Sequence, residues 1–240
     1  MRSYTRHQLK QDSFTTSTAE TITWARDNRT PVMVTGIIVV VILALVGGGW
    51  AYINYRDTQA KSDLALALQK YKAPVRPAGT PATADMLSYA SAQERDQVTN
   101  AEFTRIASKY TFTQTAQVAR YFAGLTYRDL GNDTAAVSDL QEVSGSRYKE
   151  IASLAKMALA QIDHDTGKNI DAIDVYKQLI DHPTVSVGKS TAQLALASLY
   201  ESMTRPDDAR HIYEQMQKEA PASITAEIAG QKLQTLAKNQ

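Results

Sequence analysis

An uninterrupted apolar segment near the N-terminus, Val32 to Ile53, places the strongest constraint on the fold. It contains no charge, and Thr35 is its only clearly polar side chain apart from the phenol of Tyr52. As a helix, its 22 residues would rise about 33 Å, which is enough to cross a hydrocarbon core of about 30 Å. Trp50 and Tyr55 lie at the far end, where aromatic rings favour a membrane interface. The segment predicts a transmembrane helix.

A cleaved secretory signal is the alternative interpretation of this segment. Such signals have an apolar centre of about 7–15 residues that ends in small residues of the A-x-A type. The apolar segment here is longer, follows a polar tail and ends in Gly47-Gly48-Gly49-Trp50. We therefore expect an anchor that is retained.

The composition excludes several classes of function. The formal net charge is +1, without the concentrated basic face that nucleic-acid binding needs. Cysteine is absent, which excludes disulfides and thiolate metal sites. The basic residues that flank the apolar segment are Arg26 and Arg29 before it, and Arg56, Lys61, Lys70 and Lys72 after it. This distribution does not favour an inside N-terminus, so charge leaves the membrane orientation open.

Four segments are expected along the chain. They are residues 1–30, a polar tail with a short amphipathic juxtamembrane helix; 31–53, the transmembrane helix; 54–84, a helix and a proline-rich linker; and 85–240, a repeat domain. The linker assignment rests on Pro74, Pro77 and Pro81, because proline fixes φ and removes a backbone donor.

An internal repeat organises the chain after the linker. Three segments each place a small residue four positions before a large one: Ala136 and Leu140, Ala172 and Tyr176, Ala209 and Tyr213. The three alanines lie 36 and 37 residues apart. Helix pairs repeated at about 34 residues are typical of tetratricopeptide repeats, which must stack to bury their apolar faces. The repeat therefore predicts stacked helix pairs.

Turns and flanking helices complete this pattern. Turns are expected at Gly131, at Gly167 and at Thr204–Pro206, and the second unit carries Asp163 where the pattern has an aromatic residue. Two groups with helical spacing predict a degenerate opening unit: Met86, Tyr89 and Ala90, then Phe103, Ile106, Ala107 and Tyr110. Ile224 to Leu236 predicts a terminal capping helix. The expected fold is all-α, a single N-terminal transmembrane helix followed by a tetratricopeptide-like α-solenoid of helix pairs.

Two short motifs resemble chemical sites but fail on spacing. Gly188-Lys189-Ser190 resembles the end of a phosphate-binding loop, but Pro183 stands where that loop needs a glycine. In Asp163-His164-Asp165, consecutive helical residues point about 100° apart and cannot converge on one ion. We expect no catalytic residue, no cofactor and no metal site, and hence no enzyme.

The remaining candidate site is a surface that binds protein. In a tetratricopeptide stack, the first helix of each unit lines a concave groove. Carried across by position, the groove residues are Tyr121, Leu125, Arg128, Met157, Gln161, His164, Leu194, Ser198 and Glu201. Tyr, Leu and Met suit apolar or unfolded peptide segments. The alternative left open is that the opening helices or the terminal helix cover these residues and leave no groove.

Three features of the layout occur together. They are the short lead Leu9-Lys10-Gln11-Asp12-Ser13-Phe14 with Trp24, the span that ends Gly49-Trp50-Ala51-Tyr52, and the repeats. This layout resembles the bacterial family of single-span membrane proteins with a tetratricopeptide-like periplasmic domain, which includes the ancillary subunit of the SecYEG translocon. The resemblance implies the bacterial inner membrane, a cytoplasmic N-terminus, a periplasmic C-terminal domain, and a role beside the Sec translocon with periplasmic folding factors.

These observations lead to a first hypothesis, a membrane-anchored interaction module that assists protein export or envelope protein folding. Its expected partners are proteins or unfolded client segments, with no nucleic acid. A scaffold subunit of another envelope assembly, for division or secretion, is the alternative. An enzyme of unrecognised type comes third.

Overall fold

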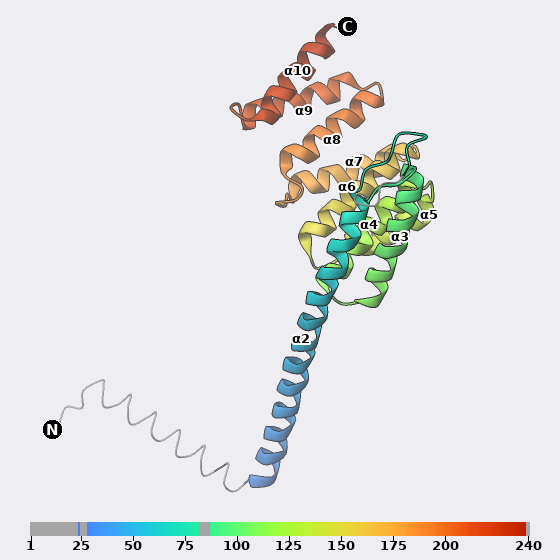
Figure 1. Cartoon of the computed structure of the whole chain (residues 1–240). Helices are drawn as coiled ribbons and strands as arrows, with labels where there is room; N and C mark the ends of the chain where they lie inside the picture. Colours follow the sequence, from blue (N-terminus) through green and yellow to red (C-terminus); the bar gives the residue numbers. More distant parts are fainter. Residues whose placement is uncertain (1–23, 25–27, 82–86, 239–240) are drawn as a thin grey trace, which may run out of the picture. The chain divides into compact units, whose positions relative to one another are not determined.

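The computed structural model describes residues 24, 28–81 and 87–238 (Figure 1). Over these residues the regular structure is helical, apart from an isolated bridge between Val75 and Tyr89. The expected all-α class is therefore confirmed. The chain separates into two compact units, Met1–Asn54 and Tyr55–Gln240. The juxtamembrane helix expected before Arg29 lies almost entirely outside the described residues.

One long helix, α2, runs from Arg29 to Tyr71 and includes the whole apolar segment. Its apolar part is long and hydrophobic enough to cross a membrane, and the most apolar window contains no buried residue. The buried residues of α2 are Ala60, Leu64 and Ala67, all in the second unit. The first unit thus presents an exposed apolar helix. Residues 55–71 of α2, which we call its soluble end, instead carry a row of small and apolar side chains that packs against the next two helices of the chain.

The second unit is a stack of antiparallel helices. They are α3 (Ala92–Lys109), α4 (Gln114–Asp129), α5 (Asp133–Ser144), α6 (Lys149–Asp165), α7 (Asn169–Asp181), α8 (Lys189–Ser202), α9 (Pro206–Glu219) and α10 (Ile224–Lys238). Each helix from α3 onward packs against the next, and further contacts join α4 to α6 and α8 to α10 (Figure 1). The pairs α4/α5, α6/α7 and α8/α9 are the three expected repeats, and α10 is the expected terminal helix.

The soluble end of α2 contributes to the same buried cluster as α3. Ala60, Leu64 and Ala67 of α2 share a buried cluster with Phe103 and Ile106 of α3. Residues 55–71 therefore pack against α3 through this cluster, and they continue the same helix as the apolar segment.

The turn inside each repeat has the same geometry. Gly131, Gly167 and Thr204 have φ values of 77°, 80° and 57°, in the left-handed region. In each turn the next N–H donates to a carbonyl five residues back, from Asn132 to Tyr127 at 2.8 Å and in the same way at 2.7 and 2.9 Å in the second and third repeats. This is the hydrogen bond of a Schellman motif, which ends a helix where glycine is favoured. The expected turns are confirmed, and Thr204 occupies a glycine position.

The small residues of the repeat lie at the contact between paired helices. Ala136, Ala172 and Ala209 are completely buried. The larger residues four positions later are buried as well, with Leu140 packed in the cluster of α4, α5 and α6. The alternation of small and large side chains lets paired helices approach while the large side chains fill the space between units.

The segment before α3 differs from the sequence expectation. Tyr89 and Ala90 were expected to be helical, but Tyr89 donates its N–H to the Pro74 carbonyl at 3.1 Å and its carbonyl accepts the Arg76 N–H at 2.8 Å. These bonds use the backbone groups that a helix would need. The helix begins only at Ala92, after Ser91, whose hydroxyl accepts the Glu94 N–H at 3.0 Å. Met86 lies outside the described residues.

Candidate functional site

All nine predicted groove residues lie on the first helices of the three repeats. Tyr121, Leu125 and Arg128 are on α4, Met157, Gln161 and His164 on α6, and Leu194, Ser198 and Glu201 on α8. Gln161 and Ser198 are exposed, and the other seven are partly buried. We call these nine residues the first-helix face. Its residues lie at the surface of the stack, where a peptide could contact them.

An aromatic cluster supports the α4 part of this face. The Tyr121 ring meets the Phe122 ring edge-on at 5.4 Å between centroids. Phe122 contacts Phe103 of α3 at 5.2 Å and Tyr71 of α2 at 5.7 Å. Burial raises the pKa of the Tyr121 phenol, and the nearby Arg128 charge opposes this shift. Tyr121 thus lies at the edge of an aromatic cluster to which three helices contribute rings.

Tyr71 of α2, which was not among the predicted site residues, joins this aromatic cluster through Phe103 and Phe122. Burial raises the pKa of its phenol, and the charges of Asp129 and Asp96 add to the shift. Its sequence signal was the helical spacing of Leu64, Leu68 and Tyr71. That spacing gave no indication that this face of α2 packs against the repeats.

His164 joins the ends of neighbouring units. Its Nδ1 lies 2.9 Å from Oδ1 of Asn169, the first residue of α7, and its Nε2 lies 3.3 Å from the hydroxyl oxygen of Ser202 at the end of α8. Both ring nitrogens therefore take part in contacts within the stack. Among the described residues no group of three or more His, Cys, Asp or Glu side chains could hold a metal ion. The geometry assigns His164 a positioning role.

The terminal helix engages Glu201. The Glu201 carboxylate accepts a hydrogen bond from the Tyr213 hydroxyl at 3.0 Å and pairs with Lys232 of α10 at 2.9 Å. Burial raises the pKa of Tyr213, and the bond to Glu201 adds to it. Leu194 of α8 and Leu233 and Leu236 of α10 pack against the same C-terminal cluster of buried residues. The terminal helix therefore contacts Glu201 of the first-helix face.

Two clefts lie elsewhere on the stack, and none of the nine residues lines either of them. One, of about 600 Å³, lies between the end of α5, α6 and the end of α7, and Lys149, Lys156 and His182 are among its lining residues. The other, of about 410 Å³, lies between α7, α8 and α9. Sequence reasoning missed both because it considered only the first helices.

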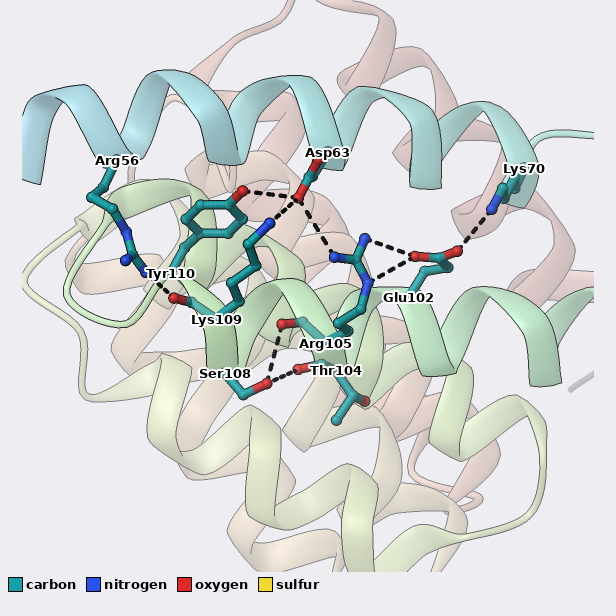
Figure 2. A network of polar contacts seen from close by, with 9 residues as sticks. All are labelled: Arg56, Asp63, Lys70, Glu102, Thr104, Arg105, Ser108, Lys109 and Tyr110. Carbon is teal, nitrogen blue, oxygen red and sulfur yellow. Dashed lines mark hydrogen bonds and ion pairs between the residues drawn. The ribbon is translucent and has the colours of Figure 1, made fainter.

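A polar network fastens the soluble end of α2 to α3 (Figure 2). Asp63 of α2 accepts a hydrogen bond from the Tyr110 hydroxyl at 2.9 Å, and it pairs with Lys109 at 3.2 Å and with Arg105 at 3.6 Å. The Tyr110 bond holds the pKa of Asp63 below its usual value, although burial opposes it. We call this set, with the pair described next, the α2–α3 clasp.

The second half of the clasp centres on Glu102 of α3. Lys70 of α2 and Arg105 donate to its carboxylate at 2.8 and 2.9 Å, and these bonds lower its pKa. Figure 2 shows these side chains in the space between the two helices. The Arg56 guanidinium also donates to the Lys109 carbonyl. The clasp therefore extends along the soluble end of α2.

A further contact attaches α2 to α4. The Thr115 N–H, in the first turn of α4, donates to the Asp57 carboxylate at 3.1 Å. The N-terminal N–H groups of a helix lack intrahelical partners, so a carboxylate there stabilises the helix. Asp57 also pairs with Lys61 at 2.9 Å. The soluble end of α2 is thus bound to the first two helices of the stack.

Comparisons with known proteins identify a family. Neither the curated proteins nor the solved structures contain a significant match to the chain. The profile of the tetratricopeptide repeat-like domain family matches residues 23–238, which include the apolar helix as well as the repeats. This range agrees with the structure, in which α2 continues from the apolar segment into the stack. The chain is a member of the tetratricopeptide repeat-like domain family.

Proposed function

We propose that the chain is a membrane-anchored interaction module that assists protein export or envelope protein folding beside the Sec translocon. Tetratricopeptide-like domains generally act by binding protein partners. The observation that carries the proposal is the placement of the first-helix face on a stack fastened to α2 by the clasp and by Asp57. A tether of this kind raises the effective concentration of the domain near partners in the same membrane.

The proposed binding surface is the part of the first-helix face that the terminal helix leaves uncovered. Leu125 and Met157 are partly buried, and Gln161 and Ser198 are exposed. A mixed surface of this kind suits extended client segments, because apolar side chains contact client side chains and amide and hydroxyl groups bind the client backbone. The domain acts in this proposal by binding and without catalysis.

The proposed location is the bacterial inner membrane, with the N-terminus in the cytoplasm and the repeats in the periplasm. Two observations support this location. The apolar segment of α2 is long enough to cross a membrane, and this segment with the residues before it resembles single-span membrane proteins that have a periplasmic domain. A cysteine introduced at Lys189, in a chain without others, tests the orientation. Labelling of intact cells by a membrane-impermeant thiol reagent is expected, and labelling only after lysis would refute it.

Photocrosslinking tests the partners. A photoreactive amino acid at Met157 should capture nascent secretory chains or translocon subunits in cells. The control position is Val185, which is 96% exposed in the α7–α8 loop. One stable envelope partner at Met157, without secretory chains, would favour the scaffold function in its place. Equal products at both positions would contradict a specific site.

A further inference from the structure

We propose that the turn between α3 and α4, Tyr110 to Thr113, is a lipid contact in which the Phe112 side chain enters the interface of the membrane that α2 crosses. This inference rests on the part of the proposed function that places α2 in a bilayer. It does not depend on the identity of the protein partner or on the orientation of the chain.

The first observation is the conformation of Phe112. Its side chain is 80% exposed, and its φ is 72°. A bulky residue with positive φ is a genuine outlier, because its Cβ collides with the backbone in that region. Phe112 therefore combines an unfavourable backbone conformation with an apolar ring that contributes no burial to the stack. Strained residues of this kind concentrate at functional sites.

The residues on both sides hold Phe112 in place. The Thr113 N–H donates to the Tyr110 carbonyl at 3.2 Å, and the Thr113 hydroxyl donates to the same carbonyl at 2.8 Å. That hydroxyl also accepts the Ala116 N–H at 3.0 Å and so caps α4. Tyr110 and Thr113 are themselves buried. The turn is thus a fixed support that points one aromatic side chain outward.

The second observation is the distance along the chain to the apolar segment. The Arg56 guanidinium donates to the carbonyl of Lys109, three residues before Phe112, and Asp57 accepts the N–H of Thr115, three residues after it. Arg56 follows Ile53, the end of the apolar segment, by three residues. Arg56 and Asp57 are thus among the first residues of α2 after the apolar segment, and their contacts attach the turn to this part of α2.

The third observation is the charge around the turn. The Tyr110 ring lies between the Lys109 ammonium, 4.6 Å from its centroid, and the Arg56 guanidinium, 5.2 Å from it. The side chains of Lys109 and Lys61 are 49% and 68% exposed. Lys109 pairs with Asp63 and Lys61 with Asp57, so their charges are partly compensated, and their exposed parts remain available to lipid headgroups. The exposed apolar ring of Phe112, close in the chain to contacts with the residues that follow the apolar segment, commits the proposal to a lipid bilayer as the occupant.

Spin labelling of the full-length chain in vesicles tests the inference. The chain has no cysteine, so Phe112→Cys and Val185→Cys each give one labelled site, and Val185 is a matched exposed apolar position. In vesicles of phosphatidylcholine and phosphatidylglycerol, the label at 112 should show an oxygen-to-nickel accessibility ratio at least about threefold above that at 185. Equal ratios at the two sites would overturn the inference. Burial of the label only in native membranes, and not in these vesicles, would assign the turn to a protein instead.

A second variant isolates the ring. Phe112→Gly removes the side chain and suits the positive φ, so the turn is expected to keep its fold. For a spin label at Thr111→Cys, the oxygen-to-nickel accessibility ratio should fall when Phe112→Gly is added. An unchanged ratio would show that Phe112 does not hold the turn at the lipid. Retention of the protein in the membrane fraction after carbonate extraction reports whether α2 is inserted. Crosslinking at Met157 reports separately on the proposed partner binding. A failure of the lipid contact at Phe112 can therefore be told apart from a failure of the proposed function.

Discussion

Gly124 of α4 faces the side chain of Leu140 of α5 so closely that a Cβ on Gly124 would lie 2.8 Å from Leu140 Cγ. Leu140 is completely buried, and Cγ lies at its branch point, so the leucine cannot move aside cheaply. The contact between the two helices of the first repeat therefore depends on the absence of a single methyl group.

Gly124→Ala should destabilise the protein. Overpacking costs about 1–3 kcal/mol, and the better helix propensity of alanine offsets about 1 kcal/mol of this. Urea unfolding of the full chain in detergent measures the difference. The control is Gly230→Ala, where the nearest atom is Nε2 at the flexible end of Gln217, 2.7 Å away. That variant should be neutral or slightly stabilised, and equal losses in both variants would contradict the packing argument.

Thr204→Gly should raise the stability. Thr204 has a φ of 57°, which costs a residue with a Cβ about 1–2 kcal/mol, more than the entropic cost of about 0.5–1 kcal/mol for glycine. The equivalent change in the first repeat, Gly131→Ala, should have the opposite sign because the φ of Gly131 is 77°. Thermal unfolding of the two variants checks this. Changes of the same sign would show that the turns are not equivalent.

The α2–α3 clasp should weaken in acid. The folded-state pKa values of Asp63 and Glu102 lie below the ordinary values of 3.8 and 4.5. The unfolded chain therefore binds more protons in this window, so the stability from these carboxylates is present above about pH 4.5 and is lost as pH falls through the folded values. Urea midpoints from neutral pH to about pH 3 measure the loss.

Asp63→Ala serves as the test variant for the same clasp. It removes the acceptor of Tyr110 and should cost about 1–2 kcal/mol at neutral pH. Its stability should also fall less steeply in acid than that of the unaltered chain. If the two pH profiles run parallel, Asp63 does not supply the acid-sensitive stability.

Glu201→Gln should loosen the terminal helix. The change removes the ion pair with Lys232 while keeping an oxygen that accepts from Tyr213, so a loss of about 0.5–1 kcal/mol is expected. Hydrogen exchange of the α10 amides should become faster while that of α4 stays unchanged. The control is Glu227→Gln on the exposed side of α10. Similar exchange rates of the α10 amides in both variants would show that Glu201 does not hold α10 against the stack.

The repeats were predictable because their signals are local. A small residue such as Ala136 indicates that two helices approach closely. A glycine such as Gly131 indicates a left-handed φ. Both requirements hold in any sequence context. Three copies at one spacing made these requirements visible together. Thr204 shows that the surrounding turn sets the conformation even where glycine is missing.

The attachment of the stack to α2 was not predictable from such signals. Asp63 and Tyr110 are 47 residues apart, and their bond depends on how two helices pack. The start of α3 was misjudged for a related reason, since the backbone of Tyr89 bonds to residues before the intervening loop. The repeat register alone was enough to place the nine predicted residues on the first helices. The ion pair between Glu201 and Lys232 of α10 could be found only from the folded structure.

Because one helix, α2, contains both the apolar segment and residues that pack into the core of the stack, the place at which a protease cuts it decides which of these stay together. A cut between Ile53 and Arg56 would separate the apolar segment from a second unit that keeps Ala60, Leu64 and Ala67 in its core. A cut after Tyr71 would separate those core residues from α3 and leave Phe103 and Ile106 uncovered, and a fragment of this kind is prone to aggregate.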